Sequence, residues 1–155
     1  YTEVTMGAIT GEGDFVYLGE LAQDRALEAM LKKAEEIGLD KGVAFIVVQK
    51  KGQQVHRIAY TVLELERDPN LDKAGDIGRN YFGTVMLKLA QMLATYENSG
   101  PSDDRPLKAG EVDYEGGIVF EPDDDHIVLI GYSGGTEEED VDISLIGKTK
   151  LLKPL

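Results

Sequence analysis

The sequence predicts a single α/β domain of the α+β type, in which a central antiparallel β-sheet is flanked by helices. Three observations support this fold class. Residues 18–37 and 72–96 carry apolar side chains at the three- and four-residue spacing of amphipathic helices. Apolar runs joined by turn residues, within 43–66 and 118–130, indicate two antiparallel hairpins. The chain has 155 residues, which suffices for one domain with a sizeable core.

We divide the chain into an N-terminal arm, residues 1–17, and a domain, residues 18–155. The arm mixes threonine, glycine and acidic residues with isolated apolar ones, and at most a short strand is expected around Val4–Ile9. The domain opens with the helix over 18–37, which Gly38 terminates.

The middle of the domain predicts a hairpin followed by a long helix. Val43–Val48 is a continuous apolar run, typical of a strand covered on both faces. Gln49–Gly52 supplies a turn, 53–66 a longer returning strand, and 72–96 the helix. Glycine inside a helix costs about 1 kcal/mol relative to alanine, so close packing or a ligand against this helix is expected. Three glycines fall in the range: Gly75, Gly78 and Gly83.

The last third predicts a loop, a second hairpin and a final helix. Asn98–Gly110 is rich in glycine, proline, serine and aspartate, which indicates a mobile loop. Ile118–Phe120 and Ile127–Ile130 are β-prone runs joined by the turn residues Pro122–Asp125.

The turn Ser133-Gly134-Gly135 before the final helix has two interpretations. In the first it is a strand-to-helix junction, where glycines permit a sharp bend and Thr136 and Glu139 form a capping box. In the second its N–H groups form a nest for a carboxylate or phosphate. The acidic run Glu137–Asp140 disfavours a highly charged phosphate. A small organic acid therefore stays open as a ligand.

Glycine motifs in this region resemble those of a known family. Gly116-Gly117 opening a strand, and Gly131–Thr136 followed by Glu139-Asp140, resemble the C-terminal half of the GlcG-type domains. That family includes the extracellular haem-binding HbpS-like proteins and the C-terminal domain of PduO-type proteins. The first helix and hairpin resemble its first half, whereas residues 57–112 depart from its pattern. The resemblance implies a GlcG-like (profilin-like) architecture and a homo-oligomer.

The resemblance also implies a ligand-binding domain for haem or a related tetrapyrrole, and haem-degrading activity stays open. Haem can be held by one axial donor, and histidine, tyrosine and methionine can all serve. Arginines can pair with its propionates. On this basis we expect cofactor-binding roles for His56, Arg79, Tyr81, His126, Gly134 and Gly135. Arg57, Met86, Tyr96 and Tyr132 are further eligible residues.

Composition limits the class of partner and the compartment. The formal net charge of −13 disfavours nucleic acids and anionic membranes, and no basic patch offsets it. There is no cysteine, so disulfides and thiolate chemistry are excluded. The sequence starts at Tyr1, which a cleaved signal peptide or a shortened sequence would explain. An extracellular or periplasmic location is therefore favoured over the cytoplasm.

Other chemistries find less support. Neither His56 nor His126 has a second histidine at ligand spacing, and Asp123–Asp125 lacks the alternation of a calcium loop. Gly131–Gly135 fits the letters of a hydrolase nucleophile elbow, but the chain is short and lacks alternating parallel strands. The rival function is a non-enzymatic assembly or protein-interaction module without a cofactor, with the acidic loop at 98–113 as its surface.

Overall fold

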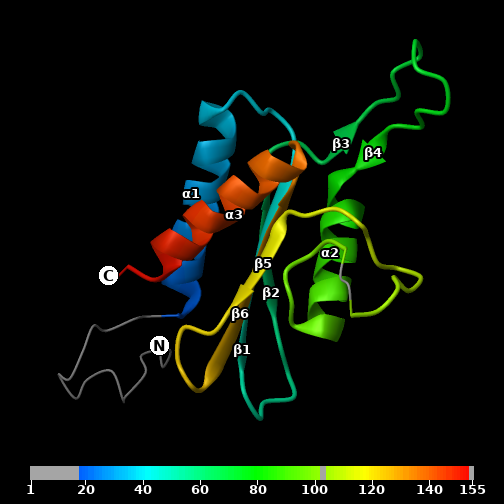
Figure 1. The fold of residues 1–155 in the computed structure, drawn as a ribbon. Helices are drawn as coiled ribbons and strands as arrows, with labels where there is room; N and C mark the ends of the chain where they lie inside the picture. Colours follow the sequence, from blue (N-terminus) through cyan, green and yellow to red (C-terminus); the bar gives the residue numbers. More distant parts are fainter. Residues whose placement is uncertain (1–17, 102–103, 154–155) are drawn as a thin grey trace.

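The computed structural model describes residues 18–101 and 104–153, and the expected arm at residues 1–17 lies outside them. The described chain contains three helices, a four-stranded antiparallel sheet and a two-stranded ladder (Figure 1). The helices are α1 (Glu20–Glu36), α2 (Tyr81–Thr95) and α3 (Glu137–Leu151). The sheet strands are β1 (Val43–Lys50), β2 (Ile58–Val62), β5 (Gly117–Phe120) and β6 (His126–Ser133), and the ladder joins β3 (Glu66–Arg67) to β4 (Arg79–Asn80).

Strand β1 lies at the centre of three layers. It pairs with β2 on one side and β6 on the other, in the order β2-β1-β6-β5. Ala44 and Ile46 pack towards α1 and α3, whereas Val43, Phe45 and Val47 pack towards α2. The sheet is therefore covered on both faces, which confirms the α+β fold class and the prediction from the continuous apolar run.

The chain between β2 and α2 differs most from expectation. The returning strand spans Ile58–Val62 rather than residues 53–66, and α2 begins at Tyr81 rather than near residue 72. Asn80 sets this start, because its side chain accepts the N–H of Gly83 as an N-cap. Residues 65–80 instead form a projection that extends from the body of the domain, with β3 and β4 at its base (Figure 1).

Asp76 organises this projection. Its carboxylate accepts two hydrogen bonds from the Arg67 guanidinium, at 2.9 and 3.0 Å, and the N–H groups of Asn70 and Gly78. Gly75 and Gly78 adopt φ values of 81° and 82°. These two glycines therefore permit turns that side chains would strain, and they are not helix positions as the sequence predicted.

The predictions for the last hairpin and for the start of the final helix are confirmed. β5 and β6 form the expected hairpin. α3 opens with the capping box, in which the Thr136 hydroxyl accepts the Glu139 N–H at 3.2 Å and the Glu139 carboxylate accepts the Thr136 N–H at 2.9 Å. The loop before β5 is anchored at its start, because the side chains of Asn98 and Ser99 accept N–H groups of β5. Among the described helices, none combines the length and the apolar character that crossing a membrane requires.

Candidate ligand-binding site

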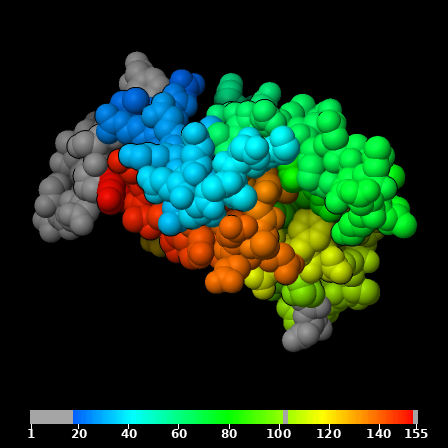
Figure 2. All heavy atoms as spheres, turned by 90° about the horizontal axis from the view of Figure 1, so that it is seen from above, coloured from blue at the N-terminus to red at the C-terminus, as the bar shows by residue number. Residues whose placement is uncertain are grey.

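A pocket of about 350 Å³ lies beside α2, where β4, the end of β6 and the start of α3 meet. Figure 2 shows the segments that border it, coloured green, yellow and orange, close together on one face. The volume is within the range of small-molecule sites. The lining residues are Arg79, Tyr81, Thr84, Lys88, Tyr114, Ser133, Gly134, Gly135, Thr136, Glu137 and Asp140.

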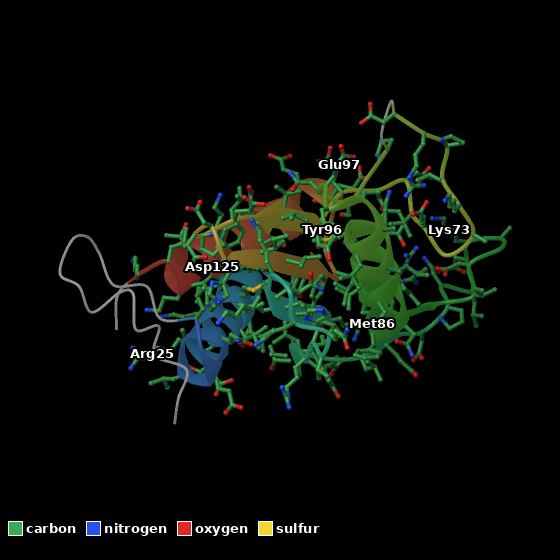
Figure 3. The ribbon with its side chains drawn as sticks, turned by 90° about the horizontal axis from the view of Figure 1, so that it is seen from below. Arg25, Lys73, Met86, Tyr96, Glu97 and Asp125 are labelled. Carbon is green, nitrogen blue, oxygen red and sulfur yellow. The ribbon has the colours of Figure 1, made fainter. Side chains whose placement is uncertain are left out.

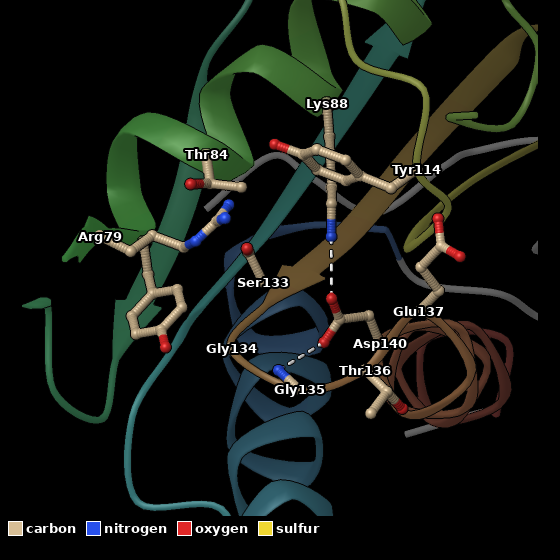
Figure 4. A pocket seen from close by; sticks show the side chains of 11 residues that line it. Arg79, Thr84, Lys88, Tyr114, Ser133, Gly134, Gly135, Thr136, Glu137 and Asp140 are labelled. Atoms are coloured by element: carbon tan, nitrogen blue, oxygen red, sulfur yellow. Dashed lines mark hydrogen bonds and ion pairs between the residues drawn. The ribbon is translucent and has the colours of Figure 1, made fainter. Parts of the chain in front are cut away.

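Two buried side chains of opposite charge meet in this pocket (Figure 4). The ammonium of Lys88 on α2 donates to the carboxylate of Asp140 on α3 at 2.9 Å, and only 1% of Lys88 is exposed. Lys88 also donates to the carbonyl of Tyr132, at 2.7 Å. The other carboxylate oxygen of Asp140 accepts the N–H of Gly135 at 2.9 Å. The pair therefore connects α2 to the end of β6 and to α3.

Burial controls how this pair titrates. Desolvation raises the pKa of Asp140 to about 6, against the opposing effect of the Lys88 charge. Desolvation likewise lowers the pKa of Lys88, against the opposing effect of Asp140. Both shifts disfavour the charged forms, so the loss of hydration outweighs the mutual attraction.

One glycine just before β5 and another just after β6 make room for the groups that meet at the pocket. Gly116 has φ 137°, and a Cβ there would overlap the ammonium of Lys88. Gly134 has φ 152°, and a Cβ there would overlap the backbone carbonyl of Lys41. The N–H of Gly135 is bonded to Asp140, so that group of the expected anion nest is already taken within the protein.

The structure separates the expected cofactor-binding residues into two groups. Arg79, Tyr81 and the two turn glycines line the pocket. His126 pairs with Lys50 at the opposite end of β6 from Ser133, roughly 23 Å away at strand spacing. His56 lies in the loop that follows β1, at that same end of the sheet, and is exposed. Figure 3 shows this separation: Asp125, the neighbour of His126, lies on the opposite side of the molecule from Lys73, which belongs to the projection.

The further eligible residues lie in other surroundings. The Tyr132 hydroxyl is bonded to the carbonyl of Lys41 at 2.7 Å, and its side chain is in the core. The Tyr96 hydroxyl donates to the side chain of Gln49 at 2.7 Å. Met86 is half-buried against the core on the α2 side, and Arg57 is exposed just before β2. These four residues do not line the pocket.

Two kinds of chemistry are not assembled in the described chain. A Ser-His-Asp triad is not formed at Ser133, because both histidines lie at the far end of the sheet. Across residues 18–101 and 104–153, no three side chains from His, Asp and Glu gather closely enough to hold a metal ion.

Lys88 and Asp140 are the site residues that sequence reasoning missed. Lys88 had a visible signal, since it falls on the apolar stripe of its helix, seven residues after Tyr81 and four before Met92. A charged residue on such a stripe must find a partner when buried. Asp140 gave no comparable signal, because it is the fourth of four consecutive acidic residues.

The lining residues suit the propionates of a haem better than its iron. Arg79 and Lys88 are cations suited to a propionate. No histidine lines the pocket among the described residues, so Tyr81 and Tyr114 are the lining residues of a type that can bind an iron.

Comparisons with known proteins support the fold. No protein-family model matches the chain, and no curated protein matches it. A solved structure of PduOC in complex with haem is similar, with a TM-score of 0.58 and 16% identity, covering 86% of this chain and 94% of that one. Ybr137w gives 0.57 at 16% identity, covering 87% and 79%. The Klebsiella pneumoniae protein ORFY, a DUF336 protein, gives 0.54 at 15% identity, covering 92% and 96%. The resemblance expected from the glycine motifs is therefore confirmed at the level of the fold.

Proposed function

We propose that this protein is a ligand-binding domain whose binding site is the pocket between α2 and the start of α3, with haem or a related tetrapyrrole as the first candidate ligand. The observation that carries the proposal is a concave site in which a buried lysine and a buried aspartate converge with hydroxyl and guanidinium groups. Binding sites commonly combine such a recess with a few convergent polar groups and shifted pKa values. Haem is the first candidate because PduOC, which shares the fold, has been solved with haem.

Haemin titration tests this proposal directly. We expect a Soret band to develop with saturable binding at one site per chain. The band should shift in Tyr81→Phe or Tyr114→Phe if a phenolate holds the iron. The matched control is Tyr96→Phe, which removes a phenol outside the pocket. A change confined to His56→Ala or His126→Ala would place the haem at the other end of the sheet and would contradict this site.

A second candidate function is assembly, and the projection favours it. Leu71 and Ile77 are 94% and 90% exposed, while the hydrogen bonds to Asp76 hold their loop in one shape. Large apolar side chains on a preorganised loop are typical of a docking element, because little ordering entropy is lost on binding.

The partner that fits is a second copy of this chain. The α2 side of β2 exposes Ile58 and Tyr60 beside Phe82, whose ring is 5.0 Å from that of Tyr60. Residues 41–63, which include Ile58 and Tyr60, carry three lysines and one arginine and no acidic residue, in a chain of net charge −13. Two of these lysines form ion pairs, Lys41 with Glu64 and Lys51 with Glu121. Two such acidic chains would therefore repel each other less at this surface than at their acidic surfaces.

Sedimentation velocity tests the assembly role. We expect a self-associating species that Leu71→Ser with Ile77→Ser converts to monomer. Leu145→Ser, which removes an exposed leucine of α3, is the control that should leave association unchanged. A monomer at all concentrations for the unaltered chain would rule this function out.

A further inference from the structure

Ser133 has an unused hydroxyl inside the pocket. It is the last residue of β6, and only 4% of it is exposed. Within the described part of the chain its hydroxyl makes no hydrogen bond, and Figure 4 shows it pointing into the pocket between Arg79 and Asp140. A buried hydroxyl without a partner is destabilising, so a bound group that accepts its hydrogen would stabilise this site.

Two positively charged side chains near this hydroxyl, Lys88 and Arg79, have N–H groups that make no hydrogen bond with the described residues. An ammonium has three N–H groups, and that of Lys88 uses two of them on Tyr132 and Asp140. The Arg79 guanidinium makes no ion pair or side-chain hydrogen bond with the described residues, and Figure 4 shows it directed into the pocket. Its positive charge contributes to the lowered pKa of Lys88, after the larger effect of burial.

The acidic groups of the pocket already accept hydrogen bonds from the protein. Both oxygens of Asp140 accept hydrogen bonds, from Lys88 and Gly135, and Glu137 accepts the N–H of Glu115 at 3.0 Å. Arg79 and Ser133 are therefore donors left for a ligand, and the second oxygen of Glu137 is the carboxylate acceptor that remains among the lining residues. The two cations and two carboxylates cancel in formal charge, which suits a singly charged anion better than a phosphate dianion.

We infer that the pocket is a carboxylate-binding site, in which the Arg79 guanidinium and the Ser133 hydroxyl contact the carboxylate while Lys88 supplies positive charge from within the protein. The inference rests on the proposed ligand-binding function and specifies the chemical group recognised. A carboxylate can come from a tetrapyrrole propionate or from a free small organic acid. Both sources present the same planar acceptor, to which a guanidinium binds well.

One experiment separates these sources. Haemin, haemin dimethyl ester and three free acids (lactate, pyruvate and succinate) are titrated into the unaltered chain and into Arg79→Ala and Ser133→Ala. Arg57→Ala is the control, because it removes an exposed arginine outside the pocket. Loss of a charge-assisted hydrogen bond should weaken the bound probe about tenfold or more in Arg79→Ala, and Arg57→Ala should leave it unchanged.

A propionate source predicts that haemin binds, that its dimethyl ester binds about tenfold more weakly or worse, and that both pocket variants weaken haemin. A free-acid source predicts that an acid binds with the same sensitivity to the variants, while haemin does not. Haemin or acid binding that neither variant weakens would overturn the carboxylate site and leave the proposed function standing. Absence of binding by all five probes would overturn both.

A second measurement needs no ligand. Because the Ser133 hydroxyl has no hydrogen-bond partner among the described residues, Ser133→Ala should unfold at the same or a higher temperature than the unaltered chain. A clear drop in the unfolding temperature would mean that the hydroxyl is bonded within the protein, and would remove this donor from the site.

Discussion

Lys88 and Asp140 lie 52 residues apart in the sequence, and their side chains meet at 2.9 Å with almost no exposure to solvent. One comes from α2 on one face of the sheet, and the other from α3 on the opposite face. Each also bonds to the backbone at the end of β6, through the carbonyl of Tyr132 and the N–H of Gly135. The ion pair therefore joins both helical layers where the pocket opens.

Removing one partner of this pair should be costly. Lys88→Met would leave Asp140 buried without its counter-charge, and such losses destabilise by about 3–5 kcal/mol. Urea denaturation followed by circular dichroism measures the change. Lys32→Met, on the exposed face of α1, should stay within about 0.5 kcal/mol of the unaltered chain.

The double variant Lys88→Met with Asp140→Asn should recover much of the lost stability, because no uncompensated charge remains and the amide can still accept from Gly135. A cost below about 1 kcal/mol for Lys88→Met alone would show that the pair is solvated, contrary to its burial.

The raised pKa of Asp140 predicts how ligand binding changes with pH. Its carboxyl titrates near 6 instead of the ordinary 3.8, in a pocket where Lys88, Arg79 and Glu137 also carry charge. Below pH 6 the proton on Asp140 leaves a net positive pocket, so a carboxylate ligand should bind several-fold more tightly at pH 5 than at pH 7. Titration of the bound probe at both pH values measures this, and Asp140→Asn should remove the dependence.

The raised pKa of Asp140 also predicts how the free energy of unfolding changes with pH. Between pH 3.8 and about 6 the folded chain holds a proton on Asp140 that the unfolded chain has lost. This group therefore makes the free energy of unfolding fall as pH rises through that window. Carbon-13 NMR of the Asp140 carboxyl reports its titration directly, and a midpoint near 4 would contradict the assigned burial.

Local patterns predicted what depends on neighbours in sequence. The stripes of α1 and α2, the turn in the last hairpin and the Thr136 capping box all act within a few residues. The glycine pairs Gly116-Gly117 and Gly134-Gly135 could also be recognised in the sequence, and the second pair lines the pocket. The start of α2 was misplaced because apolar residues such as Ile77 continue the helical spacing, although Ile77 is on the projection and almost fully exposed.

What the sequence could not supply is contact between distant segments. The projection is held by Arg67 and Asp76, which sit on opposite sides of a turn whose shape depends on Gly78. The pocket likewise needs Lys88, Ser133 and Asp140 from three elements. No periodicity reports which charged residue of an acidic run will be buried.

Asp76→Ala should loosen the projection without unfolding the domain. The substitution removes the paired hydrogen bonds to Arg67 and the acceptor for the Asn70 and Gly78 N–H groups. Amide hydrogen exchange should accelerate over residues 66–80 and stay unchanged in β1 and β6, because local opening is independent of the core. Asp72→Ala, on the same projection, is the control, since none of the described residues donates a hydrogen bond to its carboxylate. Acceleration in β1 as well would mean that the projection folds as one unit with the sheet.

Two glycine substitutions should have opposite signs. Gly131 lies opposite Phe45 in the pairing of β6 with β1, and a Cβ there would overlap the fully buried Phe45 ring. Gly131→Ala should therefore destabilise by about 1–3 kcal/mol through overpacking.

Gly83 lies in the first turn of α2, where the nearest atom to an added Cβ is the Asn80 side-chain oxygen at 3.9 Å. Gly83→Ala should stabilise by about 0.5–1 kcal/mol, because the methyl group fits and alanine loses less backbone entropy on folding. Urea midpoints of the two variants, measured side by side, give the comparison. Equal effects of the same sign would mean that Phe45 moves aside freely, so that β6 does not need glycine at this position.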